Sequence, residues 1–311
     1  MPIETSKRLT MNIVIVGSGA MGLLFYQQLN TQADVRIKTR SNDNIYKSFT
    51  YTDLHGCNTS MQYQTADEAF MKTADIVLIC VKSYDVANVV SSIKDSIAEN
   101  TIIILMHNGM GVIEELNLTT SPKNPIYTLL TTQAARKLAK NHVKHTGIGI
   151  NQIGPVNNHI GDREILDLLV ELSTNDIGFE FCNSITLLQW KKLAINCAVN
   201  ALTAINNINN GELSAAAYSK IIESITSEVI IVAELEGISL DITETLNTIK
   251  TVIKNTSMNS SSMREDVKNK RRTEVSYING YIHNLGLRHG LLTPENTKLF
   301  EQVSNLEANY G

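Results

Sequence analysis

The sequence predicts an α/β domain built on a parallel sheet, followed by an all-α domain. Its 311 residues leave room for two domains, since one domain usually takes about 100–200 residues. Short β-branched runs alternate with helical periods as far as residue 183, and long helical periods replace them beyond it. We therefore expect a first domain over 1–183 and a second over 184–311, with residues 1–10 as an extension before the first strand.

Composition narrows the class of protein. Hydrophobic residues make up 43% of the chain and the formal net charge is −4, which argues against disorder and against a basic nucleic-acid-binding protein. No apolar run reaches the roughly 18 residues of a transmembrane helix, and the first ten residues lack the apolar core of a secretory signal. We expect a cytoplasmic protein with no nucleic-acid or membrane partner; monomer and homodimer both stay open.

The cysteines argue against two kinds of site. They lie far apart and form no CxxC or CxxH pair, at Cys57, Cys80, Cys182 and Cys197. Zinc sites and disulfide frameworks depend on clustered spacings. We therefore expect neither a bound metal nor disulfide bonds.

The first predicted strand is Asn12–Val16, an apolar run typical of a strand buried on both faces of a parallel sheet. A helix is expected from the next turn through about Asn30, and 84–97 also carries apolar residues at helical spacing. Further strands are predicted at 35–38, 74–81 and 101–106, and the more polar stretch 45–64 predicts a small hairpin. This alternation is typical of a doubly wound sheet.

A glycine-rich turn directly follows the first strand and consists of Gly17, Ser18, Gly19, Ala20, Met21 and Gly22. Between a strand and a helix, GxGxxG is the fingerprint of a Rossmann-type dinucleotide-binding domain. Gly17 permits the tight turn, Gly19 lets the backbone approach a pyrophosphate, and Gly22 lets helix and strand pack closely. The alternative is a glycine-rich turn that binds no ligand.

The end of the second strand distinguishes between the nicotinamide cofactors. NAD-binding domains usually carry Asp or Glu there, for the ribose 2′-hydroxyl. This chain instead has Lys38, Thr39 and Arg40, and the fork of the Arg40 guanidinium suits a 2′-phosphate. We therefore predict NADPH/NADP rather than NADH; the alternative is that Arg40 is a solvated loop charge.

The second half of the chain predicts helices joined by short loops. They are expected at 186–206, at 212–236 with Gly237 as the C-cap, and at 242–254, with a loop at 205–210. Ser262 and Glu265 have capping-box spacing and predict a helix start at Ser262. Thr293 followed by Pro294 predicts the start of the last helix.

Polar residues recur on the first of these helices. Lys192, Asn196 and Asn200 are spaced by four along an otherwise apolar segment, so they lie along one face. This row faces solvent, forms a structural network, or lines a polar cleft, because a buried amine or amide without a partner is costly. A cleft would suit a carbonyl reductase, since an ammonium group stabilises charge on the carbonyl oxygen and delivers the proton.

A second polar cluster covers 262–280. Glu274 sits among apolar residues and is either a functional acid or a solvated helix carboxylate. The alternative for Ser262 is a capping role at a helix start, which it could fill while still touching a ligand. The cations between them read as a solvated charge run, at Arg264, Lys268, Lys270, Arg271 and Arg272.

Four blocks of the chain together resemble ketopantoate reductase (2-dehydropantoate 2-reductase), a family that reduces ketopantoate to pantoate with NADPH for coenzyme A synthesis. They are IVIVGSGAMG at 13–22, HNGMGVIEEL at 107–116, WKKLAINCAVNALTAINNINNGEL at 190–213, and TEVSYINGYI at 273–282 with TPENTKLF at 293–300. The resemblance spans nearly the whole chain from Met11. It implies an oxidoreductase that acts on a small 2-oxo acid.

The resemblance also implies roles for individual residues. Lys192 matches the catalytic lysine, and Glu274 matches a second catalytic group that holds both substrate and lysine. Asn108 matches an asparagine at the nicotinamide end of the cofactor and the substrate. Lys82 and Arg40 match cations that bind the cofactor. The remaining matches are substrate-binding residues: Asn196, Asn200, Asn210 and Ser262.

Three positions depart from the family pattern. Ala201 stands where the family often has Pro, Asp85 where it has Gln, and Gln133 where it has His. None removes a catalytic group, but together they leave open another 2-oxo acid or an imine as substrate. A non-catalytic NADP(H)-binding sensor is a further alternative, although the retained Lys192 and Glu274 argue against it.

Overall fold

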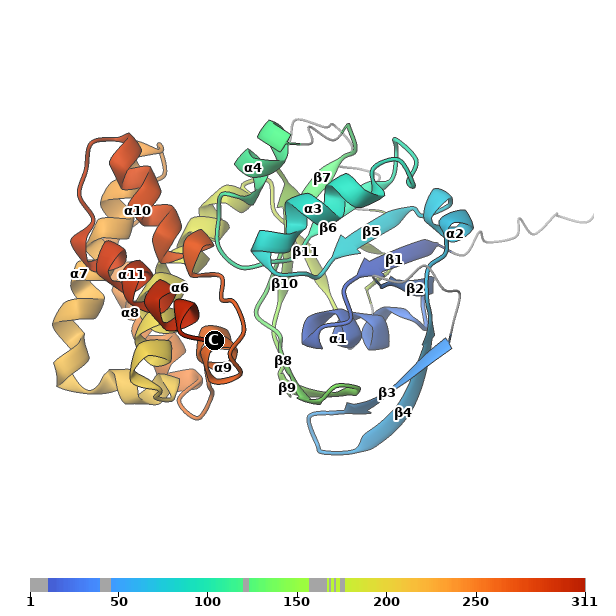
Figure 1. Cartoon of the computed structure of the whole chain (residues 1–311), viewed down its shortest axis with the longest axis horizontal. Helices are drawn as coiled ribbons and strands as arrows, with labels where there is room; N and C mark the ends of the chain where they lie inside the picture. Colours follow the sequence, from blue (N-terminus) through green and yellow to red (C-terminus); the bar gives the residue numbers. More distant parts are fainter. Residues whose placement is uncertain are drawn as a thin grey trace, which may run out of the picture. The chain divides into compact units, whose positions relative to one another are not determined.

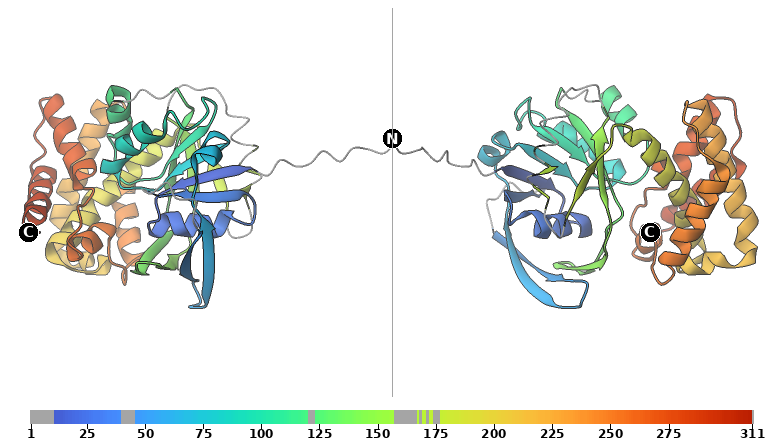
Figure 2. Two further views of the ribbon diagram at one scale, coloured as in Figure 1. Left: turned by 45° about the vertical axis from the view of Figure 1, so that its right-hand side comes forward. Right: turned by 180° about the vertical axis from the view of Figure 1, so that it is seen from behind.

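The computed structural model describes residues 11–39, 46–119, 123–156, 167, 169–170, 172–173 and 177–310. Contacts between residues divide the chain into two compact units, shown in Figures 1 and 2. Unit 1 comprises Met1–His107 and Leu116–Ile185, and unit 2 comprises Asn108–Glu115 and Thr186–Gly311. A short segment from the first half of the sequence thus belongs to the second unit.

A seven-stranded sheet, in the order β11-β10-β7-β6-β5-β1-β2, forms the centre of unit 1. Four of its strands confirm the predicted parallel strands: β1 (Asn12–Val16), β2 (Asp34–Lys38), β5 (Ile76–Ile79) and β6 (Ile102–Leu105). Every residue of β5 and β6 is buried, so both of their faces are covered and the apolar runs are continuous. The predicted α/β class of the first domain is confirmed.

Helices connect the parallel strands. They are α1 (Ala20–Leu29), α2 (Glu68–Lys72), α3 (Ser83–Ile93) and α4 (Val112–Thr119). The crossover β1–α1–β2 and the crossover β5–α3–β6 run in opposite directions along the sheet. Because such crossovers are right-handed, α1 and α3 cover opposite faces.

The remaining strands of the sheet were not predicted. β7 (Ile126–Thr131) continues it in parallel beside β6, β10 (Asn151–Pro155) adds antiparallel to β7, and β11 (Phe179–Phe181) closes the edge. The run IYTLLT was not recognised as a strand, although five of its six residues are buried.

A second sheet has the strand order β4-β3-β9-β8. The predicted hairpin within 45–64 is confirmed as β3 (Tyr46–Thr52) and β4 (Asn58–Gln64). Its other strands, β8 (Ala134–Ala139) and β9 (His142–Gly147), escaped sequence analysis. No residue of β8 is buried and four of its six residues are exposed, so no apolar alternation marks it.

Helix α1 packs between the two sheets, which explains why it is apolar on nearly every side (Figure 1). Tyr26 of α1 makes edge-on ring contacts with Phe49 of β3 and Tyr63 of β4. The Tyr26 hydroxyl also donates to the Gln62 carbonyl at 2.6 Å. These contacts fix the helix that follows the glycine-rich turn.

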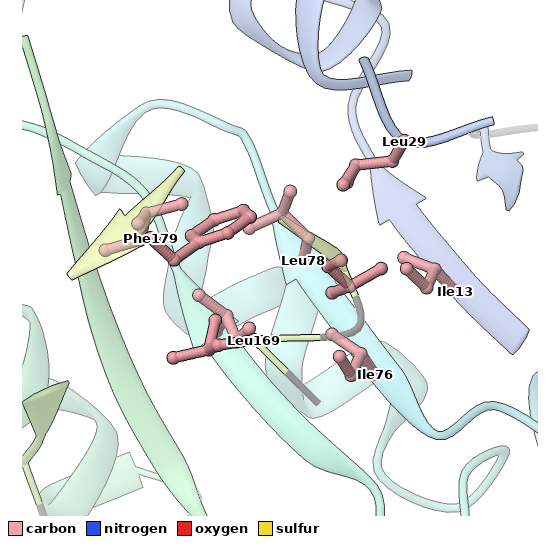
Figure 3. A pocket seen from close by; sticks show the side chains of 9 residues that line it. Ile13, Leu29, Ile76, Leu78, Leu169 and Phe179 are labelled. Atoms are coloured by element: carbon pink, nitrogen blue, oxygen red, sulfur yellow. The ribbon is translucent and has the colours of Figure 1, made fainter. Parts of the chain in front are cut away.

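A small cavity lies in the same core as α1, where Ile13, Leu29 and Leu78 approach Leu169 and Phe179 (Figure 3). The side chains that line it are all apolar. A water or a cofactor needs polar partners, so this cavity is a packing feature of the core.

The described residues of unit 2 form helices joined by loops, with no strand among them, which confirms the predicted all-α class. Its helices are α6 (Ile185–Asn206), α7 (Ala216–Leu235), α8 (Ile242–Asn255), α9 (Ser262–Lys268), α10 (Asn279–Arg288) and α11 (Pro294–Ala308). Two 3₁₀ turns, η1 (Asn210–Ser214) and η2 (Val275–Tyr277), join them. In the part of the chain that the structure describes, no helix is long and apolar enough to cross a membrane.

The prediction of one helix over 212–236 was wrong at its start. Ala215 is extended, with φ −63° and ψ 141°, and separates η1 from α7. A capping box between Asn209 and Glu212 closes η1 as a turn of its own. The C-terminal prediction is confirmed, because Gly237 has φ +77° and the Ile238 N–H returns to the Ala233 carbonyl.

The predicted capping role of Ser262 was also wrong by one residue. Ser261 is the N-cap of α9, and its Oγ accepts from the Arg264 N–H at 3.0 Å. Three consecutive serines make the sequence pattern ambiguous, and the extended backbone at Ser261 decides between them. Ser262 is the first helical residue and is exposed.

Thr293 precedes α11 as predicted, but it forms no side-chain cap. Instead the Glu228 carboxylate of α7 accepts from the N–H groups of Glu295 and Asn296, at 2.8 and 2.9 Å. The free N–H groups at the start of α11 thus find their hydrogen-bond acceptor on a neighbouring helix, and no local sequence pattern reveals such a contact.

Candidate active site

The glycine-rich turn has the geometry that its sequence predicts. Gly17 has φ +109°, a conformation that favours glycine, and a Cβ there would lie 2.8 Å from the Cys80 carbonyl oxygen. A Cβ on Gly22 would lie 2.0 Å from the Gly17 carbonyl oxygen. Gly19 is exposed, and its Cβ would meet nothing closer than 4.0 Å. Two glycines therefore shape the turn, while the third keeps its outer side open.

The N-terminus of α1 suits an anion. No side chain caps Gly19, and the first turn contains no acidic residue. The N–H groups of the first turn have no partner within a helix, and the helix dipole adds partial positive charge. This cradle fits the pyrophosphate of a dinucleotide.

Lys82 lies beside the same turn. It follows β5, the strand adjacent to β1, and precedes α3. The crevice at the carboxyl ends of β1 and β5, where the chain direction reverses, is where doubly wound sheets bind ligands. Arg40 follows β2 in the sequence and lies outside the described residues.

All the predicted substrate-site residues belong to unit 2, namely Asn108, Lys192, Asn196, Asn200, Asn210, Ser262 and Glu274. Helix α6 carries three of them along one face. Lys192 and Asn196 are half-buried and Asn200 is buried, so the row does not simply face solvent. The neighbouring Lys191 points elsewhere, since its Nζ lies 2.8 Å from Glu244 Oε1 and the side chain is largely exposed.

Burial lowers the pKa of Lys192 from its ordinary value of 10.5 to about 8, and the Glu274 carboxylate opposes this decrease. The two groups are therefore close enough to affect each other's charge. An ammonium with a pKa near neutrality is suited to donate a proton and to be recharged from solvent.

Glu274 is 4% exposed, so the solvated alternative for this residue is excluded. It directly precedes η2, and the turn that carries it is held at its start by the Thr273 N–H, which donates to Glu307 Oε1 at 2.7 Å. A carboxylate this deeply buried requires hydrogen-bond donors or a cation. It has Asn108 as donor and the electrostatic coupling to Lys192.

Asn108 reaches Glu274 through a sharply bent loop. Its Nδ2 donates to Glu274 Oε2 at 3.1 Å, and its N–H lies 3.4 Å from Oε1. The next residue, Gly109, has φ +82°, and a Cβ there would lie 2.1 Å from the Tyr277 carbonyl oxygen. That carbonyl accepts from the Met110 N–H at 2.8 Å, so the loop lies directly on the turn of Glu274.

Two tyrosines hold the continuation of this loop within unit 2. Tyr277 donates to Glu115 Oε2 at 2.8 Å, and Tyr281 donates to Glu114 Oε1 at 3.1 Å. The predicted boundary put HNGMG in the first domain, and no local pattern reveals these anchors, because both tyrosines lie more than 160 residues further along.

Two of the predicted substrate amides hold buried atoms without a protein partner among the described residues. They are Asn196 Nδ2 and Asn210 Oδ1. The other side of the Asn210 amide donates to Thr256 Oγ1 at 2.9 Å, which fixes its orientation. One donor and one acceptor thus remain for a polar ligand.

Arg264 holds the segment before Asn210. Its guanidinium donates to Asn207 Oδ1 at 2.9 Å, to the Asn207 carbonyl at 3.0 Å and to Asn209 Oδ1. The prediction that Arg264 is only a solvated charge was wrong. Its role is structural, since it joins α9 to the loop after α6.

Ser262 is held near the C-terminal half of α6 because the preceding residue, Ser261, is hydrogen-bonded to that helix. Thr203 of α6 donates to Ser261 Oγ at 2.7 Å, and Ser261 precedes α9. Ser262 itself exposes its side chain. The structure therefore brings Lys192, Glu274 and Asn108 into direct relation, and places Asn210 and Ser262 on adjoining turns.

The three departures from the family pattern occupy different environments. Ala201 is fully buried in α6, and Asp85 lies in the first turn of α3. Gln133 is buried and shares hydrogen bonds with Gln28 and Asn151. Asp85 and Gln133 belong to unit 1, whereas Ala201 follows Asn200 on α6 in unit 2.

In the described parts of the chain no group of three or more His, Cys, Asp or Glu side chains is arranged to hold a metal ion. The described site is built from an amine, a carboxylate and amides.

A dinucleotide-type α/β unit and a helical unit that couples a lysine to a buried glutamate define a class of protein, the two-unit nicotinamide-dependent reductases. The family model "ketopantoate reductase PanE/ApbA" matches residues 13–158, and the model of the C-terminal part of the same family matches 184–307. The chain belongs to the ketopantoate reductase family.

Individual proteins agree with this membership. The chain is 34% identical to the 2-dehydropantoate 2-reductase of Shigella flexneri over 300 residues, 96% of each chain. It is also 34% identical to the enzyme of that name from Vibrio cholerae, over 97% of this chain and 99% of the relative. A solved D-mandelate dehydrogenase with NADH and anilino(oxo)acetate shares the fold, with a TM-score of 0.85, 24% identity and coverage of 96% and 99%.

Proposed function

We propose that this protein reduces 2-dehydropantoate (ketopantoate) to pantoate with NADPH. The single observation that carries the proposal is the cluster of Lys192 and Asn108 around the buried carboxylate of Glu274. Full-length relatives named 2-dehydropantoate 2-reductase, at 34% identity, support the choice of substrate.

Lys192 acts as the general acid. Reduction of a 2-oxo acid converts a carbonyl oxygen to an alkoxide, and a buried ammonium stabilises that charge and protonates it. With a pKa of about 8, the amine is mostly protonated at neutral pH. Glu274 keeps this pKa from falling further and thus preserves the acid form.

The amides orient the substrate. Asn196 offers a donor and Asn210 an acceptor that no protein group uses among the described residues. A 2-oxo acid with hydroxyl and carboxylate groups has matching partners for both. Ser262 is exposed beside α6 and is the candidate for the carboxylate.

The cofactor binds to unit 1. Gly17–Gly22 would hold the pyrophosphate, with Lys82 at the neighbouring strand end. NADPH, when bound, supplies the hydride. Lys38 and Thr39 leave the end of β2 without a carboxylate, and Arg40 adds a cation for the 2′-phosphate.

The test is the oxidation of NADPH, followed by its near-ultraviolet absorbance, with ketopantoate, a second branched 2-oxo acid, and an aromatic 2-oxo acid. We expect ketopantoate to give the highest kcat/KM. A higher value with another 2-oxo acid would change the substrate but not the reaction. Cofactor binding without turnover of any of the three would indicate a sensor instead.

A further inference from the structure

Two asparagines of the C-terminal family blocks have no role in the proposed chemistry, yet both are completely buried. They are Asn279, the first residue of α10, and Asn296, near the start of α11. A buried amide is costly unless it is hydrogen-bonded, so each needs partners. Their partners connect the turn that carries Glu274 to the helix that carries Lys192.

Asn279 uses both of its donor hydrogens. Its Nδ2 donates to the Cys197 carbonyl of α6 at 3.1 Å and to Asn296 Oδ1 at 3.0 Å. Asn296 in turn donates to the Ile225 carbonyl of α7 and to Glu228 Oε2. The Cys197 and Ile225 carbonyls and the Glu228 carboxylate can only accept hydrogen bonds. Both amides must therefore turn their NH₂ groups toward these acceptors, which leaves one orientation for each amide.

The Oδ1 of Asn279 receives no hydrogen bond from the described residues. A residue needed only to fill this space would be better apolar, since an unpaired buried carbonyl destabilises the fold. We therefore attribute the presence of the amide to the two hydrogen bonds that its Nδ2 donates, which fix the position of Asn279.

The hydrogen bonds of Asn279 also affect the position of Glu274, because Asn279 directly follows the turn that carries Glu274. The turn 273–278 is held at its start by Glu307 of α11 and at the Tyr277 carbonyl by Met110. Neither contact reaches α6. The hydrogen bond from Asn279 to the Cys197 carbonyl does reach α6. Cys197 lies five residues after Lys192, which is about 7.5 Å along the helix axis at 1.5 Å per residue.

We propose that Asn279 is a positioning residue, which sets the place of Glu274 relative to Lys192 by tying the turn of Glu274 to α6. The proposal rests on the proposed roles of Lys192 and Glu274. Without this bond the carboxylate moves away from the ammonium, and its support of the protonated form weakens.

The experiment is a double-mutant cycle with Asn279→Leu and Glu274→Gln in the full-length protein. We expect Asn279→Leu alone to lower kcat by about 10- to 100-fold, the effect of a misplacement of about 1 Å. We also expect it to move the alkaline limb of the pH–rate profile to lower pH. In the Glu274→Gln background both effects of Asn279→Leu should disappear, because the group through which it acts is gone.

The control is Asn124→Leu in unit 1. Asn124 is also buried and donates to the backbone carbonyls of Ala98 and Thr101. It should lower the melting temperature without moving the pH profile. If Asn279→Leu does not fold, Asn279→Ser removes the same bond with a smaller and still polar side chain.

Two results would overturn the proposal in different ways. Equal losses of kcat from the Asn279 variant in both backgrounds, with Glu274→Gln itself impaired, would show a general structural effect and overturn this inference alone. Full activity and an unshifted pH profile of Glu274→Gln by itself would exclude Glu274 from its proposed role and overturn this inference with it, whereas the proposed reaction would fail only if the unmodified protein turned over no 2-oxo acid.

Discussion

Asn108 and Glu274 are hydrogen-bonded, Nδ2 to Oε2 at 3.1 Å, although 166 residues of chain separate them. The bond joins a glycine-bent loop from the first half of the sequence to a buried turn of the second. It places a neutral donor on a carboxylate that is also coupled to Lys192. The proposed site is thus assembled within unit 2, and each of its parts can be tested.

Lys192→Ala should lower kcat by about 10²- to 10⁴-fold, the usual contribution of a general acid. Steady-state kinetics with ketopantoate measures this. The matched control is Lys191→Ala on the adjacent position of α6, whose ammonium pairs with Glu244 at the surface. The control should keep its kcat, and a near-normal kcat in Lys192→Ala would exclude Lys192 as the acid.

Glu274→Gln should lower kcat and shift the pH dependence. Lys192 must be protonated to act, so activity falls as the pH rises through its pKa of about 8. The Glu274 carboxylate raises that pKa against the effect of burial. Its removal therefore lowers the pKa, and activity is lost at a lower pH than in the unmodified protein. An alkaline limb that stays in place would contradict the coupling.

Two glycine variants distinguish the role of a glycine in cofactor binding from its role in the shape of the turn. Gly19→Ala adds a Cβ with no neighbour nearer than 4.0 Å, so the protein should keep its melting temperature. Its methyl group would lie where the pyrophosphate is proposed to approach the backbone, and the Kd of NADPH should rise in a fluorescence titration. Gly22→Ala, which would place Cβ 2.0 Å from the Gly17 carbonyl oxygen, should destabilise the turn itself. Unchanged NADPH affinity in Gly19→Ala would argue against this binding mode.

Adjacent serines should have opposite effects. Ser261→Ala removes a helix cap and the acceptor for Thr203, and should reduce the free energy of unfolding by about 1–2 kcal/mol. Ser262→Ala should leave stability unchanged, because Ser262 is exposed, and should raise the KM for the 2-oxo acid. Urea unfolding and steady-state kinetics distinguish the two. A stability loss in Ser262→Ala with unchanged KM would reverse the assignment.

Arg40→Ala tests the choice of cofactor. Loss of the guanidinium should raise the KM for NADPH several-fold or more and leave the KM for NADH nearly unchanged, because only NADPH carries the 2′-phosphate. A preference of the unmodified protein for NADH would refute the assignment outright. Parallel titrations with the two cofactors give the answer.

Features with short sequence spacing were predictable. The strand runs β1, β2, β5 and β6, the glycine-rich turn and the polar row on α6 each depend on residues a few positions apart. Periodicity and glycine conformation act at that range. The strand β8 was missed because its local pattern is weak, and the cap of α9 was misplaced by one residue because three consecutive serines precede Met263.

The sequence by itself determined which residue types stand on which element: Gly19 before α1, Lys192 and Asn196 on α6, and Glu274 in an apolar stretch. Only the tertiary structure decided that Glu274 is buried, that Asn108 belongs to unit 2, and that Asn279 joins α10 to α6. The physical reason is the distance along the chain over which each effect acts. Local patterns act over one or two turns of chain, whereas burial and hydrogen-bond partners come from segments that are far apart in sequence.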